Sequence, residues 1–411
     1  MKIEKKLWII LFAFGIFAIC FSGWIFRQST AREKLFWDNT IRCETKELKE
    51  GEIKAENIAL PKDFDVPKSI LFKTTHTIAE VWLDGEKIYE YGNEADAPGF
   101  MKTPGSCWHI VDIPGDSSGK NLEVRIIPVY EGYYGNEVSL VYGTRGDCIL
   151  KILTDSLGIP VISCGILFAA VICILLYCGA ARRKRSDKTE AKIEIFLNLG
   201  FFSLLVAVWT LVQCGFLQFL IPDGRTLYFV EYFSLFLFPV PFNFLLYDIC
   251  KSRYHKGALI FSILYLTNMA VDVLLQCTGI IDMSRLLSVI HVIMVANVVY
   301  TVVIILYEAG KKENDVAQKF RYPMCVVMGF GMAEMIFYYL RRFEQISILL
   351  SMGTMLFIIM LIWIQVSQYY DQYIQKQKVI YLQKIANMDM LTEAMNRNAY
   401  EDMVKYLDEG E

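Results

Sequence analysis

The chain has 411 residues, a formal net charge of -3, 55% hydrophobic residues, 14% aromatic residues and a mean hydropathy of +0.36. These values exceed what a soluble globular domain usually carries and point to a membrane protein. The sequence shows neither a basic patch nor a glycine-rich phosphate loop, which argues against a nucleic-acid partner.

The first apolar run covers residues 7–26 and follows Lys2, Lys5 and Lys6. It has transmembrane length, and lysines before such a run favour a cytoplasmic N-terminus. A cleaved signal peptide is the alternative, although its apolar region usually has about 7 to 15 residues and no small-residue cleavage site follows here. We predict an uncleaved anchor over residues 1–27, and cleavage stays open.

Residues 28–156 have the composition of an all-β sandwich or jelly-roll domain and about the size of one. Short β-rich pieces alternate with turn residues, and Asp84-Gly85 suits a two-residue hairpin. The strands that we expect cover residues 70–74, 78–83, 86–91, 108–113, 122–129 and 137–142.

Aromatic residues of this domain are candidates for a ligand site: Trp82, Trp108, Tyr130, Tyr133 and Tyr134. Flat rings stack on the apolar faces of sugars, so an extracellular small molecule or carbohydrate is the ligand class that we expect. The alternative is that these rings fill the core between the sheets, which strand aromatics most often do, above all at Trp82 and Trp108.

Cysteine usage predicts little chemistry. Cys43, Cys107 and Cys148 lie in the same domain, so at most one internal disulfide can form, and its pairing stays open. There is no Cys-x-x-Cys pair, and the four histidines are scattered without metal-ligand spacing. We therefore predict no metal site.

Seven further apolar runs of near-spanning length predict a transmembrane bundle over residues 157–366. They cover residues 157–180, 195–212, 227–249, 258–277, 286–307, 323–340 and 346–366. Lys and Arg accumulate in alternate loops, with six of them in residues 181–192. This bias predicts a multi-pass plasma-membrane protein with both termini in the cytoplasm and residues 28–156 outside.

Four ionisable residues inside these runs fall toward the outer half of the bundle: Glu231, Asp272, His291 and Glu334. Such residues are costly to bury, so a shared polar pocket that senses a ligand or the state of the outer domain is one hypothesis. The alternative is hydrogen bonding between helices or exposure at helix ends.

Residues 367–388 lack Gly and Pro and predict a cytoplasmic signalling helix. Ile374, Tyr381 and Met388 recur every seven residues, with Lys378 and Ile385 between them, so a coiled coil that joins two copies in a homodimer is plausible. An ordinary amphipathic helix that continues the last membrane run explains the pattern nearly as well.

The segment 389–411 contains a motif formed by Asp389, Leu391, Thr392, Asn396 and Arg397. It resembles the opening of a GGDEF domain, the module of bacterial diguanylate cyclases. Glu393 and Ala394 stand where that family usually has Gly-Leu. Asn396 suits a helix N-cap, so we expect the first helix of a truncated GGDEF domain here.

The order of parts resembles the bacterial seven-transmembrane receptors with diverse intracellular signalling modules, whose outer domain is a jelly roll; residues 81–91 carry that likeness. The resemblance implies a sensor that relays an extracellular ligand to cyclic di-GMP output. GTP and Mg²⁺ are implied only for a full-length parent. We expect no catalytic residue, no cofactor and no cyclase activity in this chain alone.

Two other functions stay open. The chain could be a complete membrane binding protein that captures a full-length homologue as a partner or decoy. A transporter is the weaker alternative, since no inverted repeat is evident and a signalling helix is unnecessary for transport.

Overall fold

The computed structural model describes residues 40–43, 54–60, 68–93, 98–130, 138–184, 194–311, 314–340 and 347–387, with four isolated positions from Asn396 to Val404. It divides into two compact units, Met1–Ile358 and Ile359–Glu411. The predicted anchor at residues 7–26 and most of the predicted GGDEF-like motif lie outside the described residues; of the motif only Asn396 is described, and its carbonyl accepts a hydrogen bond from the Tyr400 amide at 3.0 Å.

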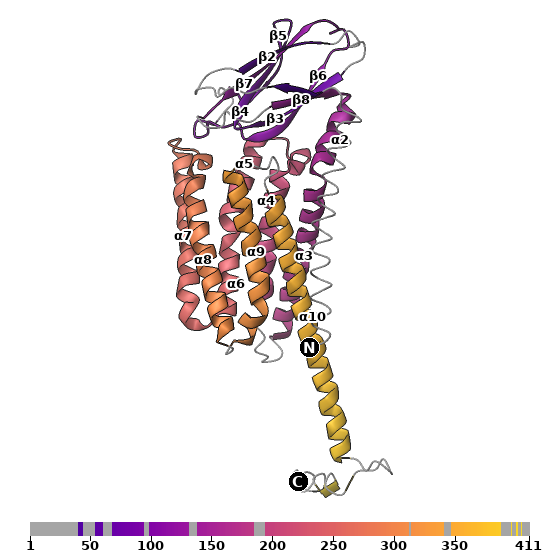
Figure 1. The fold of residues 1–411 in the computed structure, drawn as a ribbon, viewed down its shortest axis with the longest axis vertical. Coiled ribbons are helices and arrows are strands. Elements are labelled where there is room, and N and C mark those ends of the chain that lie inside the picture. The colour runs from indigo at the N-terminus through magenta and orange to yellow at the C-terminus, as the bar shows by residue number, and fades with distance from the viewer. Residues whose placement is uncertain are drawn as a thin grey trace. The chain divides into compact units, whose positions relative to one another are not determined.

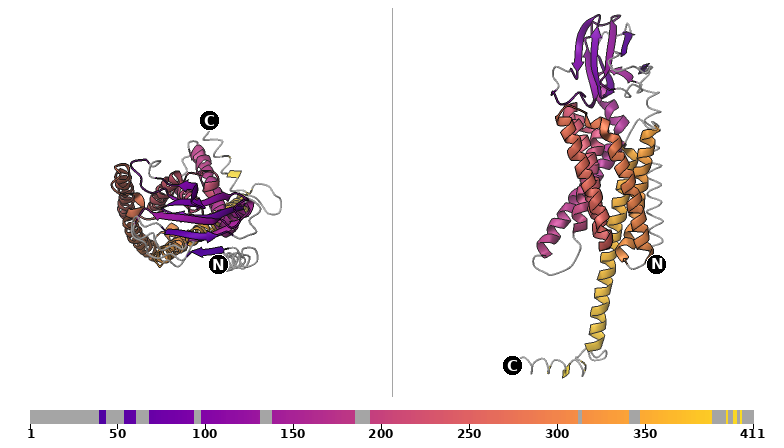
Figure 2. Two further views of the ribbon diagram at one scale, coloured as in Figure 1. Left: turned by 90° about the horizontal axis from the view of Figure 1, so that it is seen from above. Right: turned by 90° about the vertical axis from the view of Figure 1, so that its left-hand side faces the viewer.

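Two antiparallel four-stranded sheets form what we call the β domain, the described residues from 40 to 143 (Figures 1 and 2). Sheet A has the strand order β1-β8-β3-β6, and sheet B has the order β2-β7-β4-β5. The strands are β1 Thr40–Cys43, β2 Lys54–Ala59, β3 Lys68–Thr75, β4 Thr77–Leu83, β5 Glu86–Tyr91, β6 Ser106–Ile113, β7 Asn121–Pro128 and β8 Val138–Gly143. The six expected strands are confirmed, whereas β1 and β2 were not predicted.

The hairpin predicted at Asp84-Gly85 joins β4 to β5, with Leu83 paired to Glu86 across the turn. Asp84 has φ 47° and Gly85 has φ 85°. Positive φ at both central residues is what a two-residue type I′ turn requires, and its twist matches that of the flanking strands. The local sequence therefore determines this register.

One apolar core lies between the two sheets. Sheet A contributes Ile70, Phe72 and Val111, and sheet B contributes Val81 and Val124, all at most 4% exposed. These side chains alternate with outward-facing neighbours, as the period of a strand requires. Burial of this shared core holds the sheets face to face.

Helix α2, Arg145–Ser156, follows β8 directly and covers the outer face of sheet A (Figure 1). Thr144 and Asp147 form a reciprocal capping box at its start, which stabilises the helix. Ile152 and Cys148 pack with Leu71 and Val141 on the strands. This helix was not predicted; its residues were expected to belong to the end of the β domain at 28–156.

The described residues from Gly158 to Asn387 are mostly helical. The helices are α3 Gly158–Lys184, α4 Glu194–Gln213, α5 Gly224–Leu237, α6 Pro239–Ile249, α7 Ser252–Cys277, α8 Leu287–Gly310, α9 Asp315–Tyr339 and α10 Ile348–Asn387, with short 3-10 turns η2 Phe216–Phe219 and η3 Met283–Leu286. The single run expected at 227–249 forms two helices. Pro239 and Pro241 lie in the first turn of α6, where the amides have no intrahelical partner, so a new helix can begin there.

Five of these segments are long and apolar enough to cross a membrane: Gly158–Gly179, Glu194–Gln213, Gly224–Ile249, Arg253–Cys277 and Met283–Gly310. They make the chain a multi-pass membrane protein. The sixth expected run lies in α9, which carries Asp315, Lys319, Arg321 and Glu334. The apolar part of α10, Ile348–Ile364, is shorter than the five.

Polar side chains join neighbouring helices inside this bundle. Ser163 of α3 lies 2.7 Å from Thr210 of α4, and the Asn297 side-chain amide of α8 donates to Asn243 of α6 at 2.8 Å. Interhelical hydrogen bonds of this kind contribute to helix association where lipid removes the hydrophobic driving force.

Candidate functional site

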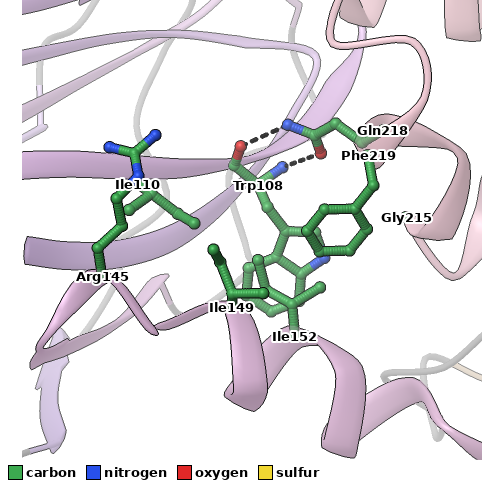
Figure 3. A pocket seen from close by; sticks show the side chains of 8 residues that line it. All are labelled: Trp108, Ile110, Arg145, Ile149, Ile152, Gly215, Gln218 and Phe219. Atoms are coloured by element: carbon green, nitrogen blue, oxygen red, sulfur yellow. Dashed lines mark hydrogen bonds between the residues drawn. The ribbon is translucent and has the colours of Figure 1, made fainter. Parts of the chain in front are cut away.

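The β domain meets the helices through a bidentate contact between β6 and η2. The Trp108 N–H donates to Gln218 Oε1 at 2.8 Å, and Gln218 Nε2 donates to the Trp108 carbonyl at 2.6 Å (Figure 3). Strand β6 is the edge of sheet A, and an edge strand leaves alternate backbone groups without a strand partner. The Gln218 amide therefore takes the place of one residue of a neighbouring strand.

Gly215, just before η2, lets the helix connection approach the Trp108 ring. Its φ of 75° lies in the left-handed region, and a Cβ there would be 2.8 Å from Trp108 Cδ1 and 2.9 Å from Nε1. The indole Nε1 is buried, and no residue in the described part of the chain bonds it. The Lys73 ammonium lies 5.7 Å from the centroid of the same ring. Any larger residue at position 215 would displace the ring.

A half-open hollow of about 250 Å³ adjoins this contact. Its lining comes from three elements: Trp108 and Ile110 of β6, Arg145, Ile149 and Ile152 of α2, and Gly215, Gln218 and Phe219 at η2 (Figure 3). The walls are as polar as they are apolar, and Arg145 in the lining binds Asp112 at 2.6 Å. A small molecule that enters would touch the β domain and the segment that joins α4 to α5 together.

A second contact joins the loop before β6 to the start of α5. The Gly105 Cα faces the Gly224 carbonyl so closely that no Cβ fits between them. Tyr91 OH donates to the Pro104 carbonyl at 2.9 Å beside it. The Gln276 side chain of α7 donates to the Phe100 carbonyl at 2.7 Å, so α7 also holds this loop.

His76 lies at the corner where the chain passes from β3 of sheet A to β4 of sheet B. Its φ is 54°, and Nδ1 lies 2.8 Å from Thr103 Oγ1, which also accepts from the Gly105 amide at 3.0 Å. The ring meets Tyr228 of α5 edge-on at 5.8 Å. Burial lowers the pKa of His76 to about 4, so the neutral ring packs at the contact with α5.

A second buried histidine, His109, lies in the β domain. Its ring nitrogens bond Thr74 at 2.7 Å and Tyr89 at 2.9 Å, and Tyr91 stacks edge-on against it. Burial lowers the pKa of His109 to about 3. Both ring nitrogens are bonded, and burial disfavours the protonated ring. The contacts of this cluster therefore stabilise the fold of the β domain.

Among the described residues, the predicted ligand aromatics Trp82 and Trp108 lie on different sheets. Trp82 alternates with buried Val81 and Leu83, so it lies on the outer face of sheet B, where the Arg125 guanidinium is 4.4 Å from its centroid. Trp108 lies on the outer face of sheet A, against α2 and η2. The expectation that both rings fill the core between the sheets is therefore wrong.

Of the other three aromatic candidates, one lies where the β domain meets the helices and two lie outside the described residues. Tyr130 is 3% exposed and lies 6.2 Å from the His76 ring and 5.7 Å from the Arg285 guanidinium that precedes α8. It therefore belongs to the contact between the β domain and the helices. Tyr133 and Tyr134 lie outside the described residues.

Each of the four ionisable candidates inside the helices has its own partner. Gln213 donates to Glu231 at 2.7 Å, Asn268 donates to Asp272 at 2.7 Å, and His291 lies 2.9 Å from Tyr339 OH. Glu334 binds backbone amides at the start of α10. Among the described contacts none of the four bonds another. The partners of Glu231, His291 and Glu334 lie on other helices, which favours the interhelical alternative there, whereas Asn268 and Asp272 both lie on α7.

Two of the three cysteines of the β domain region are free thiols. Cys107 and Cys148 are both buried, and burial raises the pKa of each thiol to about 11. Cys43 lies in β1, but its side chain is outside the described part. A disulfide between Cys107 and Cys148 is thereby excluded.

Sequence reasoning missed Gly215, Gln218, His76 and Gln276. None belongs to a motif, and Gln218 is 110 residues from its partner Trp108. Comparisons of the chain with protein-family models, curated proteins and solved structures find no match.

Proposed function

We propose that this protein is a membrane sensor in which movement of the β domain changes the position of the helices. The two parts meet at what we call the joint, which consists of Gly105, Trp108, Gly215, Gln218 and Gly224. The observation that carries the proposal is the bidentate bond between Gln218 and Trp108. A flexible tether would transmit little, whereas bonded backbone groups and two glycine contacts couple any movement of β6 to α4 and α5.

The finer architecture belongs to the same proposal. Seven spans and a cytoplasmic C-terminus agree with the alternation of Lys and Arg between loops. A jelly-roll outer domain is what the family likeness of residues 81–91 implies. The extracellular ligand would enter the hollow beside Trp108, because that hollow has walls on both sides of the joint. Its lining combines apolar rings and side chains with the polar Arg145 and Gln218, which favours a small molecule with both an apolar face and polar groups; a carbohydrate that stacks on Trp108 belongs to this class.

The output would pass along α10, a helix of 40 residues that continues well past its apolar part. Tyr381 on this helix is 60% exposed, and Ile374 is 46% exposed. Apolar side chains exposed at helical spacing support a homodimer formed through this segment. The likeness of residues 389–397 to the start of a GGDEF domain supports cyclic di-GMP synthesis as the output. GTP and Mg²⁺ would belong to that module.

The relay can be tested by photo-crosslinking of the full chain in membranes. We would place p-benzoylphenylalanine at Tyr381 and measure the yield of cross-linked dimer in the parent and in Gly215→Ala. We expect a change of several-fold, because the new Cβ pushes on Trp108. Gly119→Ala is the matched control, since Gly119 has a similar φ of 74° and nothing within 4 Å.

The proposed coupling would be refuted if Gly215→Ala gave the same yield of cross-linked dimer as the parent while its thermal midpoint stayed within a few degrees of the parent's. A parent chain that gives no cross-linked dimer at all would refute the homodimer. Capture of the chain only with a full-length homologue would instead favour a binding partner or decoy.

A further inference from the structure

The start of α10 is capped by a side chain from another helix. Glu334 of α9 accepts three backbone hydrogen bonds: from Ser347 at 2.7 Å, from Leu349 at 2.7 Å and from Leu350 at 3.0 Å. The first amides of a helix have no intrahelical partner, and a carboxylate there is favoured by the helix dipole. A single carboxylate therefore satisfies most of the first turn of the longest described helix.

The residue that would normally provide the cap does not. Ser347 directly precedes α10, and serine is among the best N-cap residues. Its hydroxyl is buried and has no hydrogen-bond partner among the described residues, and its φ is 92°, a conformation that residues other than glycine rarely adopt. Ser347 is thus held in a strained conformation whose amide points at Glu334.

Close packing of α9 on α10 continues from this cap. A Cβ on Gly331 would lie 3.6 Å from Leu350, and one on Gly353 would overlap the Phe330 side chain. Moving away from Glu334 along α9 leads to partners progressively later in α10, as in an antiparallel pair. Among the contacts of the described residues, the cap alone bonds the backbone of α10 from another helix, so we take it to define the residue at which α10 begins.

We propose that Glu334 is the positioning residue that sets the start of α10, and with it the register of its first turns against α9. Each residue that a helix gains or loses at its start changes the length of the helix by about 1.5 Å and the direction of its first side chain by about 100°. Without the cap, α10 would begin at Ser351, the next residue with a capping side chain. The regulatory meaning of this setting rests on the proposed function; the position of the helix start does not.

The test is hydrogen exchange of the full chain in lipid nanodiscs, read by mass spectrometry over residues 347–352. Glu334→Gln keeps the size of the side chain but removes the charge and one acceptor oxygen. We expect at least ten-fold faster exchange of the Leu349 and Leu350 amides, with Glu334→Asp intermediate because it keeps the charge on a shorter stem.

Glu308→Gln is the matched control. Glu308 is a second carboxylate, 2% exposed, that accepts from the Lys251 amide at 3.0 Å, directly before α7. The same substitution there should loosen the start of α7 and leave residues 347–352 as protected as in the parent. Equal exchange of residues 347–352 in the parent and in Glu334→Gln would overturn the proposal, as would an effect of Glu308→Gln at α10.

Ser347→Gly keeps the test decisive if Glu334→Gln does not fold. Glycine accepts a φ of 92° without strain, so a capped helix should exchange its first amides no faster than the parent does. Faster exchange in Ser347→Gly would contradict the proposal. If exchange changes in Glu334→Gln while the dimer yield at Tyr381 does not, the cap stands and the proposed sensor function fails.

Discussion

Gly105 of the β domain and Gly224 at the start of α5 approach so closely that a Cβ on Gly105 would overlap the carbonyl group of Gly224. The two residues belong to different parts of the fold, and the Tyr91 hydroxyl also lies against Gly224, where it donates to the Pro104 carbonyl. The distance between the β domain and α5 at this point is therefore determined by the backbone of the two glycines and by the Tyr91 ring.

Gly105→Ala should consequently destabilise the protein more than its small size suggests. The φ of 84° costs about 1 kcal/mol for alanine, and the overlap adds roughly 1–3 kcal/mol. Gly119→Ala, with φ 74° and open space, should show only the first of these costs. Thermal midpoints of both variants in the same detergent measure the difference. Equal midpoints would mean that the β domain does not rest on α5 in solution.

Gln218→Met tests the bond between η2 and the edge strand. Methionine fills a similar volume but leaves the Trp108 N–H and carbonyl without partners, which should cost about 1–3 kcal/mol. The Trp108 amide should then exchange with solvent faster. The Val81 amide, in the central strand β4, should keep its protection. An unaltered Trp108 amide would show that solvent satisfies the edge as well as Gln218 does.

Sequence periodicity was sufficient to predict those strands in which apolar and polar residues alternate and a clear turn follows. Val81 and Leu83 alternate with Trp82, and Asp84-Gly85 permits only a tight hairpin. Strand β2, Lys54–Ala59, has the sequence KAENIA, whose polar residues carry no strand signal. Its place in sheet B comes from pairing with β7, far along the chain.

Alternation shows that neighbouring side chains point to opposite faces, but it does not show which face is the interior. The large rings of Trp82 and Trp108 suggest burial, yet the smaller residues beside them fill the core. Trp108 faces outward because α2 and η2 provide a second apolar surface there. That surface depends on tertiary contacts between segments with no common sequence pattern, so the joint could not be predicted.

Membrane topology can be measured with two epitope tags. A tag inserted after Gly119 lies in an exposed turn between β6 and β7, and a second tag follows residue 411. Because Lys and Arg accumulate in alternate loops, the first tag should react only from outside the cell and the second only from the cytoplasmic side. Inside-out and right-side-out vesicles, each probed with antibody, give the result. Tags on one side would invalidate the predicted orientation.

Acidification should weaken the fold through His76. Its pKa is about 4 in the folded protein, against 6.5 for an unperturbed histidine, so between these values only the unfolded chain binds the proton. The stabilisation is therefore complete above about pH 6.5 and is lost as the pH falls toward 4, by about 2 kcal/mol between pH 7 and pH 4.5. His109 has the same sign, because burial lowers its pKa to about 3.

His76→Asn separates the two histidines. Asparagine tolerates the positive φ of 54° and can still bond Thr103, but it does not titrate. The thermal midpoint of the variant should fall less between pH 7 and pH 4.5 than that of the parent, and the residual slope should come from His109. Parallel pH profiles for parent and variant would show that His76 is protonated or exposed in the native protein, and the tight contact between this corner and Tyr228 would then not exist at neutral pH.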